Sequence, residues 1–144
     1  MLQSFVDEFD LPGTNPVTPA TAGETLHSDD EVELLDVVGH SKYRSGVGKL
    51  LHLAKWSRVE MLNRVRELSR FMSKPNVLHW KAMLRAMKYA DNTANRGVLL
   101  RPNRKWDGKD KSFEFIVSGM ADADYAANLE TRRSVSGYST FLEG

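Results

Sequence analysis

Two aspartates near the carboxyl end of the chain have the residue type and spacing of a metal site. Asp122 and Asp124 follow an apolar run, Phe113 to Val117, and this pattern predicts a strand around them. Side chains two residues apart in a strand leave the same face of a sheet. Two carboxylates on one face can hold a hard cation such as Mg²⁺ for phosphoryl chemistry. The alternative is that Asp-Ala-Asp marks an exposed strand end without function.

A complete site of that kind needs further carboxylates. Only Glu130 and Glu143 follow in the sequence. One aspartate, or two, cannot build a two-metal centre. We therefore expect this chain alone to be without catalytic activity and to bind no Mg²⁺.

Basic residues are concentrated in the middle of the chain. Residues 1–36 contain nine Asp/Glu and no Lys/Arg, residues 37–105 contain sixteen Lys/Arg and three Asp/Glu, and residues 106–144 contain four and seven. Such segregation favours a polyanion partner, because phosphate contacts release counterions without reading sequence. The alternatives are a solvated helix face, or an acidic arm that neutralises the basic segment. The candidate nucleic-acid-binding residues are Lys55, Arg58, Arg64, Arg66, Arg70, Lys81, Arg85 and Lys88.

The elements that position these side chains are predicted from apolar spacing. Residues 1–9 have the spacing of two helical turns, and prolines and acidic residues over 10–38 predict an extended, mobile arm. Three amphipathic helices follow, which together predict a small bundle over residues 39–93. Ser57 with Glu60 has the pattern of a capping box for the second of these helices, and Asn76 can cap the third.

The segment 94–144 predicts strands instead of helices. Val98–Leu100 and Phe113–Val117 are expected to flank a hairpin that contains Asp107-Gly108. Met120–Ala126 continues extended, and Ser136–Leu142 is a further strand. The fold class is therefore α+β, with a helical bundle followed by a partial antiparallel sheet.

Composition excludes several classes of protein and site. The chain has no cysteine, so disulfides and thiolate metal sites are excluded, and its four histidines lack close metal-ligand spacing. No segment is long and apolar enough to span a membrane, and the acidic amino terminus is unlike a targeting peptide. We expect an intracellular protein, in the cytoplasm or the nucleus, with no membrane partner.

Three tryptophans could stack on bases. Trp80 lies on the apolar stripe of the third helix and is assigned to the core. Trp56 is the better candidate for exposure, although capping of the core is favoured over base stacking. Trp106 completes the set.

A series of motifs occurs in order along the chain. They are Tyr43-Arg44-Ser45-Gly46-Val47-Gly48-Lys49-Leu50, Leu68-Ser69-Arg70-Phe71-Met72, His79-Trp80, Arg96-Gly97-Val98-Leu99-Leu100, Asp122-Ala123-Asp124-Tyr125-Ala126, and Arg132-Arg133-Ser134-Val135-Ser136-Gly137-Tyr138 with Phe141-Leu142. This series resembles copia-type retrotransposon polyproteins, in the region where the reverse transcriptase runs into ribonuclease H. Two departures are Val59, where a proline is usual, and Ala121, where a serine usually precedes the aspartate.

The resemblance implies a place for each segment. Residues 1–38 would be the exit from the polymerase palm, residues 39–93 the thumb or connection region, and residues 94–144 the first strands of ribonuclease H. Asp122 would match the first metal-binding carboxylate of a Mg²⁺-dependent ribonuclease H, and Asp124 is the less favoured ligand. The implied partners are an RNA/DNA hybrid or other nucleic acid, and the remainder of the polyprotein.

Three functions follow as hypotheses. The first is a polyprotein fragment that binds nucleic acid through its basic helices without catalysis. The second is ribonuclease H activity at Asp122, completed by another chain. The third is a domesticated structural or interaction module whose open sheet edge pairs with a partner.

Overall fold

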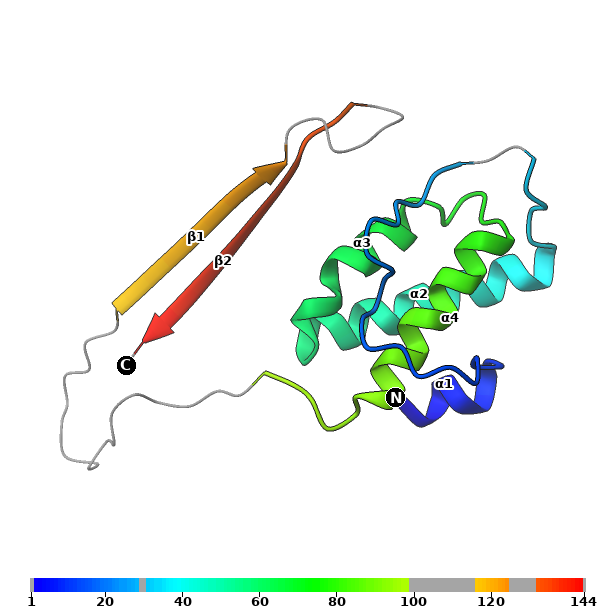
Figure 1. Ribbon diagram of the computed structural model, residues 1–144, viewed down its shortest axis with the longest axis horizontal. Coiled ribbons are helices and arrows are strands. Elements are labelled where there is room, and N and C mark those ends of the chain that lie inside the picture. Colours follow the sequence, from blue (N-terminus) through cyan, green and yellow to red (C-terminus); the bar gives the residue numbers. More distant parts are fainter. Residues whose placement is uncertain (1, 29–30, 99–115, 125–131, 144) are drawn as a thin grey trace. The chain divides into compact units, whose positions relative to one another are not determined.

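The computed structural model describes residues 2–28, 31–98, 116–124 and 132–143, and the chain divides after Val98 into two compact units (Figure 1). The first unit is helical and the second contains a two-stranded antiparallel sheet, which confirms the α+β class. The described elements are α1 (Leu2–Glu8), α2 (Val37–Trp56), the 3₁₀ turn η1 (Val59–Met61), α3 (Leu62–Ser69), α4 (Val77–Asn92), β1 (Ile116–Asp124) and β2 (Val135–Glu143).

The helical unit has four α-helices among its described residues, so the expected three-helix bundle is not confirmed. The additional member is α1, which packs against α4 (Figure 1). Phe5 of α1 is fully buried, and the ring of Phe9 lies 5.9 Å from that of Trp80. The two turns were expected from their spacing, but their place in the same core depends on contacts with a distant helix.

The helix α2 packs against both α3 and α4. Asp36 caps its first turn, because the carboxylate accepts a hydrogen bond of 2.7 Å from the backbone N–H of Gly39. The buried face carries Tyr43 and Val47 at helical spacing. The hydroxyl of Tyr43 donates to the carbonyl of Leu68 at 2.8 Å, which ties α2 to α3.

The corner between α2 and α3 differs from the expected capping box. Ser57 ends α2, since its backbone N–H and its hydroxyl both donate to the carbonyl of Leu53, at 3.0 and 3.3 Å. Arg58 precedes η1, where no side chain caps the turn. Glu60 pairs with Arg58 instead of reaching back to Ser57. The predicted capping box at Ser57 and Glu60 is therefore wrong.

The cap predicted at Asn76 is confirmed. Its side-chain oxygen accepts from the N–H of His79 at 3.0 Å, and the N–H of Asn76 donates to Nδ1 of His79 at 3.1 Å. Both side chains are 2% exposed. This reciprocal box fixes the first turn of α4, which carries Lys81, Arg85 and Lys88.

The acidic arm packs against the helices in its described part. Leu26 is 6% exposed and belongs to the core cluster. The N–H of Leu35 donates to the carbonyl of Pro75 at 3.0 Å, and the N–H of Val77 donates to the carbonyl of Glu33 at 3.1 Å. A mobile arm was expected here, but these hydrogen bonds hold the backbone of residues 31–36 beside the cap of α4.

The strands β1 and β2 pair in a continuous register of nine residues, from Ile116 opposite Glu143 to Asp124 opposite Val135. The strand expected over 136–142 is confirmed, as is the extended segment before Asp124. The hairpin at Asp107-Gly108 lies outside the described residues, as do Leu99 and Leu100 of its first strand, residues 113–115 of its second strand and residues 125–126 of the extended segment.

Candidate nucleic-acid interface

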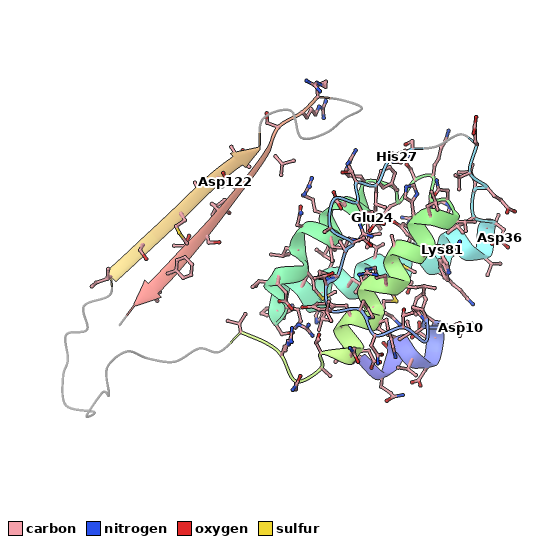
Figure 2. The ribbon with its side chains drawn as sticks, viewed as in Figure 1. Asp10, Glu24, His27, Asp36, Lys81 and Asp122 are labelled. Carbon is pink, nitrogen blue, oxygen red and sulfur yellow. The ribbon has the colours of Figure 1, made fainter. Side chains whose placement is uncertain are left out.

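Three of the predicted basic residues are exposed: Lys55 near the end of α2, Arg66 on α3 and Lys81 on α4. Lys81 is labelled in Figure 2. Nζ of Lys55 lies 5.3 Å from the centre of the Trp56 ring. Arg66 donates to Oδ1 of Asn63 from Nη2 at 3.0 Å and from Nε at 3.2 Å. Among the described residues, none of the three has an acidic partner, so their charges are available to a polyanion.

Three further predicted residues, Arg70, Arg85 and Lys88, are partly buried. The guanidinium carbon of Arg70 lies 5.2 Å from the centre of the Phe71 ring. Nη2 of Arg85 approaches the hydroxyl of Thr18 at 3.5 Å. Nζ of Lys88 pairs with a carboxylate oxygen of Asp91 at 3.4 Å. These side chains are accessible in part, but each is constrained by its neighbours.

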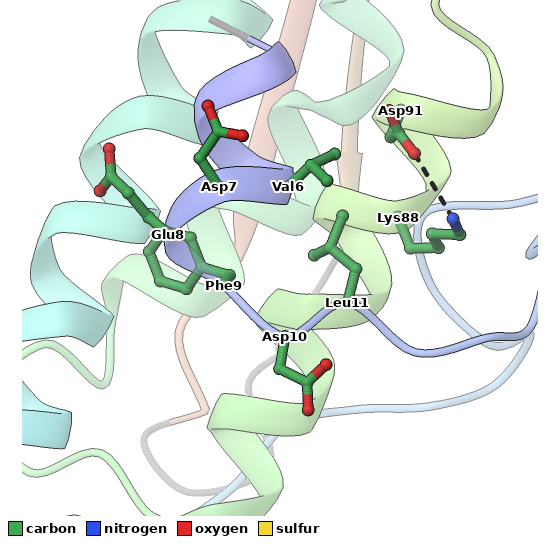
Figure 3. Close-up of a pocket in the computed structure, with 8 residues that line it drawn as sticks. All are labelled: Val6, Asp7, Glu8, Phe9, Asp10, Leu11, Lys88 and Asp91. Atoms are coloured by element: carbon green, nitrogen blue, oxygen red, sulfur yellow. Dashed lines mark hydrogen bonds and ion pairs between the residues drawn. The ribbon is translucent and has the colours of Figure 1, made fainter.

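Lys88 also lies in acidic surroundings. It lines a pocket of about 480 Å³ together with Asp91 and with residues of α1 and of the segment that follows it (Figure 3). Four carboxylates line this pocket, from Asp7, Glu8, Asp10 and Asp91. A phosphate approaching Lys88 would meet these charges, so Lys88 is a weak member of the interface.

Arg58 is buried, which removes it from the interface. Its side chain is 2% exposed and its Nε pairs with Glu60 at 2.7 Å. Its Nη1 donates to the carbonyls of Ala90 and Thr93, at 3.3 and 3.1 Å, and Nη2 donates to the Thr93 hydroxyl. The ring of Tyr89 lies 5.2 Å from its guanidinium carbon. Arg58 therefore fastens the α2–α3 corner to the end of α4.

Arg64 is also buried and ion-paired. It is 2% exposed, and its guanidinium pairs with Glu24 of the arm at 3.1 Å and with Glu67 at 3.4 Å. The sequence held a signal for this position, since Arg64 stands three residues after Met61 and four before Leu68, both fully buried. A basic residue between two core positions on one helix stripe points inward.

The Glu24–Arg64 pair shows how the arm neutralises part of the basic segment. Burial by itself would raise the pKa of Glu24, but the Thr21 backbone N–H and the Arg64 guanidinium together lower it below the ordinary value. Glu8 of α1 pairs with Lys49 of α2 in the same way. Intramolecular neutralisation, one of the alternatives from the sequence, therefore accounts for these two cations.

Two of the tryptophans are described, and they differ in exposure. Trp80 is half-buried against the core, as its spacing predicted. Trp56 is 69% exposed, and its ring lies 6.3 Å from that of His52. The prediction that Trp56 caps the core is wrong, because its side chain is mostly exposed to solvent at the end of α2. Trp106 lies outside the described residues.

Asp122 lies on β1 with an exposed side chain (Figure 2). Its Oδ1 accepts from the N–H of Ala123 at 2.9 Å, and its partner in the register is Gly137, which contributes no side chain. Asp124 lies two residues along the same strand. Within the described ranges, no three His, Asp or Glu side chains gather in a way that could hold a metal ion. Glu130 lies outside those ranges.

No described helix has the length and apolar character needed to cross a membrane.

Comparison with known proteins places the chain. No family model matches it, and no solved structure matches it. It is 26% identical over 147 aligned positions to the retrovirus-related Pol polyprotein from transposon TNT 1-94 of Nicotiana tabacum, which covers 99% of this chain and 10% of that polyprotein. It is 30% identical to the corresponding polyprotein from transposon RE1 of Arabidopsis thaliana, over 91% of this chain and 8% of that protein.

A further relative has a different name. The secreted RxLR effector protein 161 of Plasmopara viticola is 35% identical over 102 residues, which are 71% of this chain and 66% of that protein. The chain thus spans about two thirds of this relative and about a tenth or less of the polyproteins. The similarity to several Pol polyproteins extends over most of the chain, and the chain is a homologue of one segment of the copia-type retrotransposon Pol polyproteins, consistent with a fragment of such a polyprotein.

Proposed function

We propose that this chain is a nucleic-acid-binding segment of a copia-type retrotransposon polyprotein and that it holds an RNA/DNA hybrid without cleaving it. The observation that carries the proposal is the exposure of Lys55, Arg66 and Lys81 without an acidic partner among the described residues. Arg70 and Arg85 add partly exposed charge. Binding of this kind is electrostatic and independent of sequence, and it takes place in the cytoplasm or the nucleus.

A salt titration of a short RNA/DNA hybrid, followed by fluorescence anisotropy, tests this function. The logarithm of the binding constant should fall linearly with the logarithm of salt concentration, with a slope of up to about 0.9 for each phosphate neutralised. The triple variant Lys55→Ala, Arg66→Ala, Lys81→Ala should flatten that slope by two to three times this amount. Absence of binding at low salt, or binding that salt does not weaken, would contradict the proposal.

A second triple variant controls for net charge. Lys42, Arg44 and Lys74 are exposed and lie outside the predicted interface. Replacing all three by alanine removes the same charge from other positions. If both triple variants lose the same affinity, then the whole charge of the unit binds nucleic acid and the three named residues have no special part.

The remainder of the polyprotein is the second proposed partner, and the two-stranded sheet supports it. Its register places Val117 beside Leu142 and Ala121 beside Tyr138 on one face. The side chains of Val117, Tyr138 and Leu142 are 66%, 86% and 66% exposed. A hairpin of two strands is marginally stable in water, so this apolar face requires a cover. The matching segment is about a tenth of the length of the polyprotein relative from transposon TNT 1-94. We propose that another part of such a polyprotein covers this apolar face.

Ribonuclease H activity is the alternative, and Asp122 is the observation that favours it. Mg²⁺ takes carboxylate ligands, and Asp122 is exposed opposite a residue without a side chain. The described residues nonetheless do not fit a complete Mg²⁺ site, since no group of three ligands occurs among them. Cleavage would therefore require another chain. Hybrid cleavage with Mg²⁺ that is abolished by Asp122→Asn would establish this alternative, and no cleavage would reject it for this chain.

A further inference from the structure

A cavity of about 460 Å³ lies between the arm and α4, within the helical unit. Glu24, Leu26 and His27 line it from the arm, and Leu78, Lys81 and Arg85 line it from α4. Glu24, His27 and Lys81 are labelled in Figure 2. The volume is within the range of small-molecule sites and exceeds what an inorganic ion fills. The cavity therefore has room for an organic ligand.

Two cations line the cavity, and neither is paired with the carboxylate of Glu24 that also lines it. Lys81 and Arg85 are one helical turn apart on α4, a spacing at which like charges repel. Neither has an acidic partner among the described residues, and Nε of Arg85 is buried without a hydrogen bond. In contrast, the buried residues Arg58 and Arg64 of the same unit are each paired with a carboxylate. An anion in the cavity would supply the missing partner.

Glu24 and His79 also line the cavity, and both are engaged with other partners. The carboxylate of Glu24 also lines the cavity, but it pairs with Arg64 at 3.1 Å and accepts from the N–H of Thr21 at 3.1 Å. His79 uses Nδ1 for the N–H of Asn76, and its Nε2 donates to the carbonyl of His27 at 3.1 Å. Both ring nitrogens of His79 are thus engaged. Two cationic side chains remain for a ligand.

The charge and the apolar wall together select a class of ligand. A phosphate monoester carries about −1.5 to −2 at neutral pH, which matches two cations, whereas an internal phosphodiester or a carboxylate carries only −1. Arg and Lys are the side chains that bind phosphate in proteins. Leu26 and Leu78 offer an apolar surface beside them.

We propose that this cavity binds the terminal phosphate monoester of a nucleotide. Lys81 and Arg85 contact the phosphate, and Leu26 and Leu78 pack against the sugar or the base. The source of the ligand rests on the proposed function, because a nucleic-acid strand that ends in a 5′-phosphate presents this group. The pocket then recognises a strand end, while the exposed cations outside it hold the strand.

Short RNA strands with and without a 5′-phosphate test the proposal. The wild-type chain should bind the phosphorylated strand at least fivefold more tightly, and Lys81→Gln and Arg85→Gln should each reduce that ratio to below twofold. Lys81 is exposed, so its variant keeps the test valid if Arg85→Gln unfolds. In contrast, Lys55→Ala should weaken the binding of both strands and leave the ratio of their affinities unchanged. Equal binding of the two strands by the wild type, or an unchanged ratio in the glutamine variants, would overturn the site.

Titrations with adenosine 5′-monophosphate and with inorganic phosphate separate this site from the proposed function. Binding of the monophosphate, lost in Lys81→Gln, would support the cavity even if no strand binds and the proposed function fails. Strand binding without any response to the monophosphate would refute the cavity alone. Inorganic phosphate that binds as tightly as the monophosphate would overturn the role given to Leu26 and Leu78.

Discussion

Replacement of Arg58 by alanine should destabilise the helical unit without changing the salt dependence of nucleic-acid binding. Arg58 has the charge and the helical spacing of an interface residue, but it is 2% exposed and hydrogen-bonded from three of its nitrogens. A structural role and a phosphate-binding role therefore make opposite predictions for the same variant.

The size of the effect follows from what the truncation leaves behind. The carbonyls of Ala90 and Thr93 would lose their buried donor, at about 1–3 kcal/mol for a group left unsatisfied. Loss of one partner of a buried ion pair costs about 3–5 kcal/mol, but the Glu60 side chain is 43% exposed and can return to water. We therefore expect the lower end, a loss of about 3 kcal/mol in the free energy of unfolding.

Urea denaturation followed by circular dichroism measures this loss. The control is Lys55→Ala, which removes an exposed charge three residues earlier and should change stability by less than about 0.5 kcal/mol. Where Arg58→Ala is still folded, the slope of binding against salt should equal that of the wild type. A loss below about 1 kcal/mol together with a flatter salt slope would refute the structural assignment.

Two more predictions concern α2 and the arm. A Cβ at Gly46 would lie 2.5 Å from Sδ of Met83 and 2.7 Å from Cε of Met87, so Gly46→Ala should cost about 1–3 kcal/mol. Gly48 lies on the same helix, but a Cβ added there would have no neighbour within 4 Å, so Gly48→Ala should stabilise the unit by about 0.5–1 kcal/mol. Denaturation midpoints of the two variants that shift in the same direction would contradict this reasoning. Glu24→Gln should cost about 1–2 kcal/mol at pH 7. The pKa of Glu24 in the folded state is below its ordinary value of 4.5. The difference in unfolding free energy between wild type and variant should therefore be complete above pH 4.5 and vanish as the pH falls through the folded pKa. A difference that persists in strong acid would exclude the ion pair as its source.

Elements determined by local pattern could be predicted from the sequence. Asn76 was recognised as a cap because its polar side chain stands directly before the apolar stripe of α4. The strand over 136–142 is predictable because its residues include types that favour strands, among them Tyr138, Thr140 and Phe141. The cap depends on His79, three residues away, so it needs no tertiary information. The extended conformation of the strand follows from local pattern, but its pairing with β1 joins residues much further apart in the sequence.

The arm and the buried arginines depended on contacts across the chain. Proline and acidic composition predicted a mobile arm, but Leu26 is buried in the core, and a backbone bridge joins Leu34 to Asn76. Composition does not reveal a partner strand that lies beside the cap of a helix. The charge of Arg58 alone predicts an interface residue, because its acceptors, Ala90 and Thr93, are more than thirty residues away in the sequence. The eight predicted basic residues cannot be told apart by charge and helical spacing, although two of them, Arg58 and Arg64, are buried and stabilise the fold.

The charge of the helical unit determines how it can bind a polyanion. Up to Val98 the chain has thirteen Lys/Arg and twelve Asp/Glu, so its net charge is +1 in spite of the strongly basic middle segment. A unit of this charge has little long-range field to steer nucleic acid, and encounter should be slow compared with strongly basic domains. Affinity must then come from side chains whose charge the arm leaves unbalanced. Arg64 is paired with the arm and Lys49 with α1, whereas Lys55, Arg66 and Lys81 have no acidic partner in the part of the chain that the structure describes. The proposed binding should therefore depend on these few positions more than on total charge.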